Sequence, residues 1–583
     1  MNKKEKKQDL QTLRHSAAHV LAQAVLQMFP EAKLAIGPST DEGFYYDFDL
    51  PRTLIPEDLD ILEKKMKDII KADYQVKPEE VVKEKALDFY KKGKQVYKRE
   101  LINDIPKKKV YFYRQNDFVD LCAGPHVKST GEIKAFKLLK IAGAYWRGDE
   151  KRPMLQRIYG TVFYTQKELE EYLKNLEEAK KRDHRRLGKD LDLFVFSDLV
   201  GQGLPLFTPK GTIIRQEMQK YSSELRKEID YQEVSTQEIN KGELFKISGH
   251  YEKYKEDMFQ IFSHHTKEEY FLKPMNCPQH TQIYASKIRS YKDLPYKVAD
   301  FSMIYRDEKP GEVGGLTRVR GFEMDDGHCF CREDQIEAEF DKVLKAIKKA
   351  LKTYGMDFYV RLSLRDPKEK AKYLGDDQVW NKSEKILEKI AKDNKISYEI
   401  GIGEAAFYGP KMDIMAKDAL NREHQISTIQ LDFNMPKRFN LSYASDDGKN
   451  YMPVMIHSAL IGSIDRFLGV LIEHYAGAFP AWLAPVQVII IPISDKKHLK
   501  YAKEISKNVL EKDIRVEIDS RPESVGKKIR EAELQKIPYM FIVGDKEIKA
   551  KKISVRNYKK GDLGQKSLKF IDDIKQEIDK RQG

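Results

Sequence analysis

Two histidines near the N-terminus have a spacing that suits a small metal or hydrolytic site. They are His15 and His19, in the sequence LRHSAAHVLAQAVLQMFP, whose apolar periodicity predicts an amphipathic helix ended by Pro30. Residues four apart lie on one face of a helix, so the two imidazoles should lie side by side. The HxxxH pattern alone is common and needs a second group of ligands before it indicates a site.

A second group of this kind lies much further along the chain, in DLCAGPHV. There Asp120, Cys122 and His126 flank a Gly-Pro turn. Nitrogen and sulfur atoms from the two groups could bind zinc, or could activate a water molecule without a metal. The alternative is a closed structural zinc site with four ligands, namely His15, His19, Cys122 and His126.

A glycine-rich hairpin, residues 305–328, is the second place where we expect chemistry. Residues 316–330 suit a strand, in which side chains two apart share a face. That face would carry, in order, Arg318, Arg320, Phe322, Met324, Asp326 and His328. Such a row suits the floor of a site for a polyphosphate, a flat base and a small polar ligand. Arg306 on the partner strand adds a third cation, and a charged, solvated hairpin is the alternative.

Cys277, His328 and His457 form a possible zinc site in the same region. Cys277 lies in FLKPMNCPQH, and His457 ends an extended run, YMPVMIH. Three protein ligands would leave the fourth position of zinc open, as catalytic sites do. Their separation in the sequence does not require the three residues to meet, and Cys329 and Cys331 are rival ligands.

An arginine within an apolar helix pattern indicates an anion site. The segment SALIGSIDRFLGVLIEHY carries Arg466 near its middle, where a guanidinium needs a carboxylate or a phosphate. No Gly-x-x-x-x-Gly-Lys loop is present, so any nucleotide must be held by arginines and aromatic rings. Four other residues, which by pattern alone are only polar groups near strands, are Tyr408, Lys411, Gln425 and Gln430.

Length and composition restrict the class of protein. A chain of 583 residues with 41% hydrophobic and 34% charged residues is typical of a folded protein with three or four domains. The net charge of +13 favours a polyanionic partner, nucleic acid first, although lysine-rich proteomes produce such charges in proteins of every kind. No apolar run is long enough to span a membrane, and the N-terminus lacks the apolar segment of a signal peptide, so we expect a cytoplasmic protein.

The order of patterns predicts an α+β multidomain protein. Residues 1–165 form a first α+β unit, and residues 166–190 a charged connecting helix. In residues 191–483, helical and strand patterns alternate irregularly, which favours a domain built on an antiparallel sheet. In residues 484–583, apolar strands alternate with lysine-rich helices, which predicts a small three-layer α/β domain that could face RNA.

Several motifs together resemble the bacterial threonyl-tRNA synthetase family across nearly the whole chain. HSAAH and CAGPHV are similar to that family's editing domain, with AGAYWRGD and LQRIYGT beyond them. KPMNCP, RVRGF, QLDF, PVMIH, GSIDRF and AWLAPVQV are similar to its catalytic domain. The resemblance implies a class II synthetase fold: an antiparallel-sheet core, an editing domain over residues 1–165, and an anticodon-binding domain over residues 484–583.

The resemblance also implies roles for the residues of the catalytic domain. Zinc is expected on Cys277, His328 and His457, and Mg²⁺ with ATP. The residues expected to bind ATP are Arg306, Arg318, Phe322, Gln425 and Arg466, with Phe322 stacking on adenine. The residues expected to act in catalysis or in the threonine pocket are Arg306, Arg466, Asp326, Lys411, Gln430 and Tyr408.

For the remaining domains the resemblance implies editing and tRNA recognition. The expected editing residues are His15, His19, Cys122 and His126, supported by Tyr46, Lys98 and Asp120. Glu547 and Arg556 match residues that contact the anticodon. The implied activity is that of a threonine–tRNA ligase, which activates threonine with ATP, transfers it to tRNA(Thr) and hydrolyses mischarged seryl-tRNA(Thr). Expected partners are tRNA(Thr), ATP, threonine and a second copy of the chain in a homodimer, with no membrane.

The chain also departs from the family pattern. Family members often carry a ubiquitin-like domain, whereas only a short stretch precedes His15. Met324 stands where a glutamine usually faces the amino acid, Gln237 where the first class II motif has a proline, and Pro522 where an asparagine often assists anticodon reading.

Two other functions are compatible with the same fold. An RNA-binding regulatory paralogue would have a disabled catalytic core, and only Met324 and Gln237 favour it. A synthetase for another amino acid is the second alternative. The presence of the three zinc candidates and of Asp326 argues against it, and Arg466 argues against the paralogue.

Overall fold

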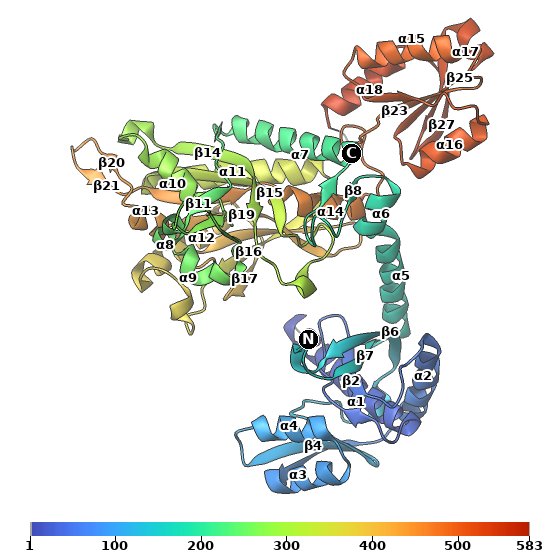
Figure 1. Ribbon diagram of the computed structural model, residues 1–583, viewed down its shortest axis with the longest axis vertical. Coiled ribbons are helices and arrows are strands. Elements are labelled where there is room, and N and C mark those ends of the chain that lie inside the picture. Colours follow the sequence, from blue (N-terminus) through green and yellow to red (C-terminus); the bar gives the residue numbers. More distant parts are fainter. Residues whose placement is uncertain (1–2, 582–583) are drawn as a thin grey trace. The chain divides into compact units, whose positions relative to one another are not determined.

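The computed structural model describes residues 3–581 and divides into two compact units (Figure 1). Unit one comprises the residues up to 177, and unit two the residues from 178 onward. This division falls inside helix α5 (Gln166–Arg182), so the expected domain boundary at residue 165 stays a prediction. Within the described residues, no helix is long and apolar enough to cross a membrane.

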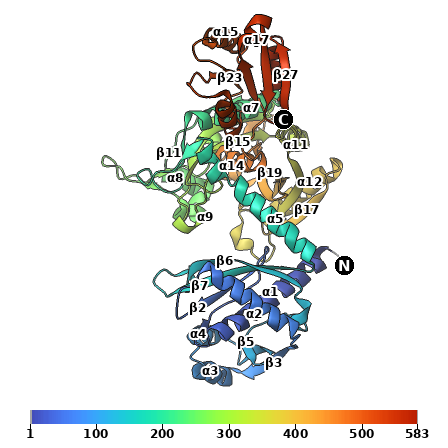
Figure 2. The ribbon, with the colours of Figure 1, turned by 90° about the vertical axis from the view of Figure 1, so that its right-hand side faces the viewer.

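Unit one is built around helix α1 (Lys3–Met28), which contacts a four-stranded antiparallel sheet (Figure 2). The strand order is β1 (Lys33–Leu34), β2 (Phe44–Asp49), β7 (Met154–Phe163) and β6 (Ala135–Tyr145). Helix α2 (Pro56–Lys71) packs beside α1 and on β6. Fully buried alanines such as Ala17 and Ala18 let α1 approach its neighbours closely. The predicted helix end before Pro30 is confirmed.

A smaller antiparallel sheet in unit one leads to the cysteine. Its strands are β3 (Val76–Val82), β4 (Lys109–Gln115) and β5 (Phe118–Leu121), and its helices are α3 (Lys83–Lys92) and α4 (Val96–Asp104). Because β5 ends at Leu121, Cys122 is the first residue of the loop that leaves this sheet.

The predicted connecting helix over residues 166–190 is two helices. α5 ends at Arg182, and α6 (His184–Asp190) begins two residues later. The break lies at Asp183, whose carboxylate accepts a hydrogen bond from the backbone N–H of Arg185 and caps α6. A capping carboxylate within a charged run therefore gave a helix boundary that the charge pattern did not indicate.

The core of unit two is an eight-stranded sheet, which confirms the predicted antiparallel core. The strand order is β10 (Gln232–Glu233), β14 (Tyr296–Tyr305), β15 (Gly321–Cys331), β22 (Val454–Ala459), β19 (Glu423–Asp432), β18 (Lys411–Lys417), β16 (Asp357–Leu364) and β17 (Tyr398–Ile402). All neighbours are antiparallel except the two edge pairs. The helices that pack on it include α7 (Pro209–Glu228), α11 (Ile336–Thr353), α12 (Asp377–Asp393) and α14 (Ile464–His474).

The hairpin between β14 and β15 differs from the sequence prediction. The strand expected over residues 316–330 begins only at Gly321, because a tight turn precedes it. In that turn, the backbone N–H of Gly314 donates to the carbonyl of Arg318, and the N–H of Arg318 donates to the carbonyl of Gly314. Arg318 and Arg320 therefore lie in a loop. The side chains that keep the expected two-residue period are Phe322, Met324, Asp326 and His328.

Shorter elements complete the part of unit two before residue 484. The small sheets are formed by β8 (Phe194–Val195) with β9 (Leu206–Phe207), by β11 (Ile239–Lys241), β12 (Gln260–Ile261) and β13 (Tyr270–Leu272), and by β20 (Tyr443–Ala444) with β21 (Asn450–Tyr451). The short helices are α8 (Gly242–Ser248), α9 (His250–Tyr254), α10 (Cys277–Ala285) and α13 (Asn434–Arg438).

The last hundred residues form the expected three-layer α/β fold (Figure 1). The strand order is β24 (Val516–Ile518), β23 (Val488–Pro492), β25 (Tyr539–Val543), β26 (Lys552–Asn557) and β27 (Gly561–Ser567), with the first three parallel. The helices are α15 (Leu499–Leu510), α16 (Val525–Leu534), α17 (Asp545–Ala550) and α18 (Phe570–Asp579). Two separate apolar clusters show that both faces of the sheet are covered.

A buried ion pair joins helix α7 to the central strands, and we predict that it is required for stability. The guanidinium of Arg226 donates to Asp325 at 2.9 Å and to Ser458, and both charged side chains are almost fully buried. Changing Arg226→Met leaves the carboxylate of Asp325 without a cation, which costs about 3–5 kcal/mol of unfolding free energy. Urea denaturation followed by tryptophan fluorescence measures the loss.

An exposed pair between the same helix and its neighbour provides the control. Lys349 on α11 contacts Glu228 on α7, with both side chains more than half exposed to solvent. Changing Lys349→Met should leave the urea midpoint unchanged, because exposed pairs contribute little. Equal midpoints for Arg226→Met and the parent protein would contradict the importance of the buried pair.

Candidate functional site

A row of polar side chains crosses four neighbouring strands of the large sheet. In the strand register, His328 on β15 is directly opposite His457 on β22. His457 is opposite Gln430 on β19, and Gln430 is opposite Lys411 on β18. Residues that pair in register share a face of the sheet, so the four side chains line one surface. Four of the expected site residues are thus brought together by the topology.

One end of this row meets Cys277, the first residue of α10. Potential ligand atoms of Cys277, His328 and His457 all lie within 4.8 Å of one another, and the three residues are buried. Nε2 of His328 is 3.0 Å from Nδ1 of His457. Two nitrogens bound to a tetrahedral zinc lie about 3.3 Å apart, so the spacing of these atoms fits zinc.

The second nitrogen of each imidazole has its own partner. Nε2 of His457 is 3.1 Å from Oδ2 of Asp432, and Nδ1 of His328 is 2.6 Å from Nδ1 of His280. These contacts leave Nδ1 of His457 and Nε2 of His328 to face the ligand position. Partners of this kind hold metal-binding histidines in the correct tautomer and orientation. The donor set therefore fits a three-residue zinc site.

Burial sets the protonation of these groups. It raises the pKa of the Cys277 thiol well above its ordinary value and lowers the pKa of His328 well below its own. The neutral imidazole is the form that binds a metal, and a thiolate at this depth needs a cation beside it. The rivals Cys329 and Cys331 belong to the apolar core on the other face of β15, so they do not join this group.

A cavity of about 560 Å³ includes in its lining Gln430, the residue opposite His457. Its lining includes Arg306, Arg318, Phe322, Met324, Gln425, Gln430, Ser463 and Arg466. The guanidinium of Arg306 lies 5.4 Å from the centre of the Phe322 ring. The prediction that Met324 faces the site is consistent with this lining. Cations, an aromatic plate and polar amides therefore surround one cavity.

Arg466 and Arg318 enter the cavity in different electrostatic states. Desolvation by the surrounding protein lowers the pKa of Arg466, although the residue is exposed to solvent, and among the described residues no carboxylate forms an ion pair with it. Arg318 is 51% exposed and pairs with Glu308 at 2.8 Å and with Glu312 at 2.7 Å. A bound phosphate would meet a free cation at Arg466, but would have to replace carboxylates at Arg318.

The other expected pocket residues are already linked to one another. Nζ of Lys411 lies 2.7 Å from Asp413, which also accepts a hydrogen bond from Nε2 of Gln425 at 2.8 Å. The hydroxyl of Tyr408 donates to Oε1 of Gln430, and its ring stacks on His457 with centres 4.8 Å apart. These contacts hold the amides in fixed orientations at the edge of the cavity.

Asp326 lies on β15 between Met324, which lines the cavity, and His328. Its Oδ1 is 3.6 Å from Nε2 of His328, and burial raises the pKa of the carboxyl. This position, with the oxygen beside the ligand atoms, matches an acceptor for a hydroxyl group of a ligand bound there.

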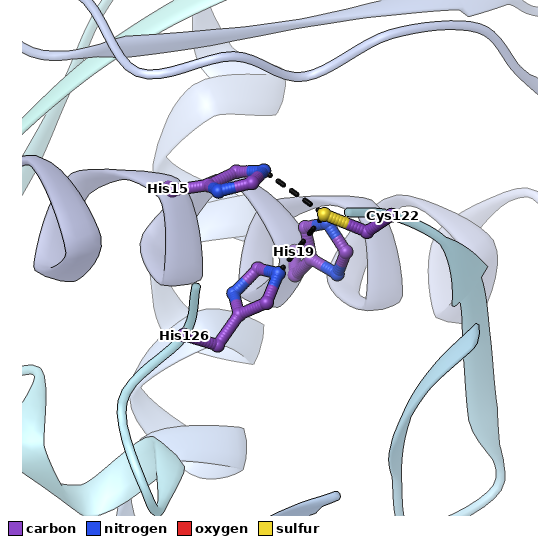
Figure 3. A group of neighbouring side chains, drawn as sticks. All are labelled: His15, His19, Cys122 and His126. Carbon is purple, nitrogen blue, oxygen red and sulfur yellow. Dashed lines mark hydrogen bonds between the residues drawn. The ribbon is translucent and has the colours of Figure 1, made fainter. Parts of the chain in front are cut away.

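Unit one contains the second cluster (Figure 3). His15 and His19 extend from α1, while Cys122 and His126 come from the loop after β5. Sγ of Cys122 lies 3.3 Å from Nε2 of His15 and 3.2 Å from Nε2 of His126. Helix spacing and the Cys-His loop thus bring the four residues together, as the sequence predicts.

The tautomer of His126 follows from Ser16, a residue that the sequence did not single out. The hydroxyl of Ser16 donates to the carbonyl of Thr12 and lies 3.1 Å from Nδ1 of His126. Because the hydroxyl proton of Ser16 is donated to Thr12, Nδ1–H of His126 must donate to the Ser16 oxygen. The Nε2 lone pair of His126 then faces Cys122. Burial raises the pKa of Cys122 to about 11 and lowers the pKa of His126. A protonated thiol beside a neutral imidazole is the resulting state.

Asp120 organises the supporting residues. It accepts a hydrogen bond from the hydroxyl of Tyr46 at 2.6 Å, and its other oxygen lies 2.5 Å from Nζ of Lys98. Nε2 of His19 is 3.7 Å from the same carboxylate. The three supporting residues expected from the sequence therefore form one buried group below the cluster. The four sulfur and nitrogen ligands also have the proximity that a metal needs, so both earlier alternatives persist.

The two residues expected at the anticodon differ in accessibility. Arg556 on β26 is partly exposed, with its guanidinium 3.5 Å from Glu533. Glu547 is buried, and its oxygens accept from the backbone N–H of Gly544 and from Ser554. A contact from Glu547 to RNA would have to replace one of these bonds, so its role stays a prediction.

Sequence reasoning missed several residues of the two sites. His280 lies three residues after Cys277, and this short spacing is a signal that could have found it. Asp432 ends the QLD segment, one strand away from His457. His250 carries no such signal, although its Nε2 lies 3.9 Å from Sγ of Cys277.

Three models of known protein families match parts of the chain. The chain matches the tRNA synthetase class II core domain (G, H, P, S and T) over residues 254–475 and the anticodon binding domain over residues 487–578. It also matches the threonyl and alanyl tRNA synthetase second additional domain over residues 110–159.

Individual relatives cover nearly the whole chain. The threonine–tRNA ligase of Thermus thermophilus is 49% identical over 96% of this chain and 87% of its own length. That of Halalkalibacterium halodurans is 46% identical over 98% and 89%. A solved structure titled the RNA binding domain of threonyl-tRNA synthetase from Cryptosporidium parvum superimposes with a TM-score of 0.65 at 36% identity, covering 68% of this chain and 98% of that one. This chain belongs to the threonine–tRNA ligase family.

Proposed function

We propose that the two clusters divide the work of a threonine–tRNA ligase with editing. In unit two, threonine is activated with ATP and transferred to tRNA(Thr); in unit one, seryl-tRNA(Thr) is hydrolysed. The observation that carries the proposal is the cavity of about 560 Å³, whose lining includes Arg306, Arg466 and Gln430. Gln430 is directly opposite His457 of the Cys277–His328–His457 group, and Arg466 forms no ion pair among the described residues. Family membership supports the reaction, and the chemistry of the residues supports their roles.

Selection of threonine would depend on the group of cysteine and histidines. An apolar pocket separates threonine from its isostere valine by only roughly 1–3 kcal/mol. A zinc ion held by Cys277, His328 and His457 would keep an open position for the amino group and hydroxyl of threonine, which valine cannot fill. Asp326, beside His328, would accept the hydroxyl proton.

ATP would occupy the cavity between the arginines. Phe322 would stack on adenine, Arg306 and Arg466 would neutralise the α-phosphate and the polyphosphate, and Arg318 would leave its carboxylates to meet them. The threonine carboxylate attacks the α-phosphorus and pyrophosphate leaves, with Mg²⁺ on the phosphates. Little covalent help is required, so positioning and charge stabilisation account for most of the catalysis.

Further pocket residues would orient the amino acid and the nucleotide. Gln425 and Lys411 are held by Asp413, and Gln430 by Tyr408, so each presents a fixed polar group. Met324 offers a thioether where relatives of this kind usually have an amide. One polar contact is therefore absent.

Editing follows from a limitation of the first site. Serine also has an amino group and a hydroxyl, and lacks only a methyl group, which is worth roughly 10–200-fold in discrimination. A second, hydrolytic site is then needed. In unit one, the neutral imidazoles of His15 and His126 would activate water, while Cys122, His19, Lys98, Tyr46 and Asp120 hold the ester and the histidines in place.

The remaining assignments rest on family membership. We place the protein in the cytoplasm and as a homodimer, with Glu547 and Arg556 near the anticodon of tRNA(Thr). The alternative of a regulatory paralogue is not favoured, because the chain matches threonine–tRNA ligases at 46–49% identity over at least 96% of its length and retains the candidate ligands.

Zinc removal should abolish amino-acid activation. A chelated sample with verified metal loss should show threonine-dependent pyrophosphate exchange reduced on the order of 100-fold or more, because the ligand for the substrate hydroxyl is missing. In the zinc-containing enzyme, threonine should support exchange, serine less, and valine none.

Cysteine variants provide the matched control for this experiment. Cys277→Ala should lose zinc, whereas Cys331→Ala, a buried cysteine on the other face of β15, should keep one zinc per chain. Full exchange activity in a metal-free enzyme would contradict the role of zinc, and no exchange at full zinc content would contradict the synthetase assignment.

The Cys122→Ala variant should separate editing from charging. Charging with threonine should be unchanged, whereas hydrolysis of preformed seryl-tRNA(Thr) should fall by about 100-fold or more, since the thiol that contacts His15 and His126 is gone. Glu79→Ala, an exposed change on β3 of the same unit, should clear seryl-tRNA normally. Normal clearance by Cys122→Ala would exclude this residue from the mechanism.

A further inference from the structure

A buried imidazole behind the wall of the cavity belongs to neither cluster. It is His184, the first residue of α6, and it is hydrogen-bonded to the loop that precedes β15. We propose that His184 is a positioning residue for ATP: it holds the backbone of the 314–319 loop, which forms one wall of the cavity. The inference rests on the proposed function, because it takes that cavity as the ATP site.

The hydrogen bonds of His184 determine its tautomer. Its Nδ1 lies 2.7 Å from Oε1 of Glu473, and its Nε2 accepts the backbone N–H of Leu316 at 3.0 Å. A backbone N–H can only donate, so Nε2 carries the lone pair and Nδ1 carries the proton. The side chain of His184 is 6% exposed and Leu316 is fully buried, so no water replaces this bond.

Two glycines make room for the ring. A Cβ on Gly315 would lie 2.1 Å from Nε2 of His184, and Gly315 also has a left-handed φ of +53°. A Cβ on Gly469, in α14, would lie 3.2 Å from Cβ of Leu316 and 3.6 Å from Cδ2 of His184. The imidazole is therefore packed between the loop and the helix that carries Arg466 one turn earlier.

Glu473 is itself held in place as an ionised acceptor. It also accepts the backbone N–H of His184, and Arg422 contacts its other oxygen at 2.5 Å. Burial favours a higher pKa for Glu473, but the hydrogen bonds from His184 and the charge of Arg422 outweigh it and lower the pKa. Arg422 and the two donors of His184 occupy the carboxylate of Glu473. The group of Asp183, His184 and Glu473 therefore orients the imidazole of His184 rather than binding a metal.

The consequence for ATP follows from the loop. Leu316, Thr317, Arg318 and Val319 all line the cavity, whereas His184 does not. If the Nε2 acceptor of His184 is removed, the N–H of Leu316 is buried without a hydrogen-bond partner. The loop must then move to bring this N–H to another acceptor. The position of Arg318 moves with it, so binding of ATP should weaken while the reacting groups on the strands stay in place.

Two amide variants separate the two hydrogen bonds of His184. His184→Asn can still donate to Glu473 but does not reach Leu316, while His184→Gln can place its carbonyl oxygen near the position of Nε2. In threonine-dependent pyrophosphate exchange, His184→Asn should raise KM for ATP about 5- to 10-fold, with kcat and KM for threonine little changed. His184→Gln should restore most of the affinity.

A matched control lies in the anticodon-binding part. His498 is also buried, accepts the backbone N–H of Ser494 on Nδ1 at 3.0 Å and faces Asp545 with Nε2. His498→Asn should lower thermal stability in the same way as His184→Asn, but leave KM for ATP unchanged. A purely structural role for His184 predicts instead that both variants behave alike.

Calorimetric binding of ATP, without threonine, gives a readout that does not need catalysis. The Kd for ATP should rise in His184→Asn by the same factor as KM and recover in His184→Gln. An unchanged Kd in a folded His184→Asn variant, or equal losses in both amide variants, would overturn the positioning role. A parent protein that binds ATP but shows no exchange would instead contradict the proposed activity, and the Kd values would then decide the role of His184.

Discussion

The antiparallel pairing of β15 with β22 is the constraint on which the catalytic part depends. It places His328 directly opposite His457, although the two residues are 129 positions apart. Alternate residues of β15 point to opposite faces, so one set faces the cavity while Asp325 faces helix α7 and its buried Arg226. A slip of one residue would exchange these faces, turning His328 away from His457 and Asp325 away from Arg226. The ion pair and the ligand set therefore enforce the same register.

Burial has different chemical consequences in the two clusters: it favours metal binding in unit two and water activation by an imidazole in unit one. In unit two, burial keeps His328 neutral with a lone pair free for a metal, and a bound metal would hold Cys277 as the thiolate. In unit one, the pKa of Cys122 is raised to about 11, so the sulfur is a protonated thiol at neutral pH. Its neighbours His15 and His126 are neutral, and the single S–H proton can be donated to one of them. This state favours activation of water by an imidazole over attack by a thiolate.

Local sequence patterns predicted which site residues lie on the same face of one helix or one strand, but not which elements come together. Helical spacing placed His15 beside His19, and strand parity placed Met324, Asp326 and His328 on one face. The resemblance to a family supplied the long-range pairings, which periodicity cannot. The predicted start of β15 at residue 316 was wrong, because the turn at Gly314 depends on backbone hydrogen bonds that no residue pattern requires. The domain boundaries stay predictions.

Long-range polar contacts are the part that the sequence does not show. His184 reaches Glu473, 289 residues away, and its role depends on a tautomer that only the surrounding donors define. Two glycines are the only weak sequence signal of this contact that we identify. Gly315 and Gly469 lie far apart in the sequence and would read as a turn and a tolerated helix residue, yet both leave space for one ring.

The arginines of the cavity show why such a contact matters for function. Arg466 is fixed on a helix capped by Ser463 and has no acidic partner among the described residues, so it is ready for an anion. Arg318 pairs with Glu308 and Glu312, and a bound phosphate would have to replace these carboxylates. That exchange is favourable only when the loop backbone stays where the phosphate can reach it, because a moving loop adds an ordering cost to each binding event. On our proposal, the bond from Leu316 to His184 removes this cost before ATP binds, so that Arg318 is already in position for the phosphate although its side chain is partly exposed.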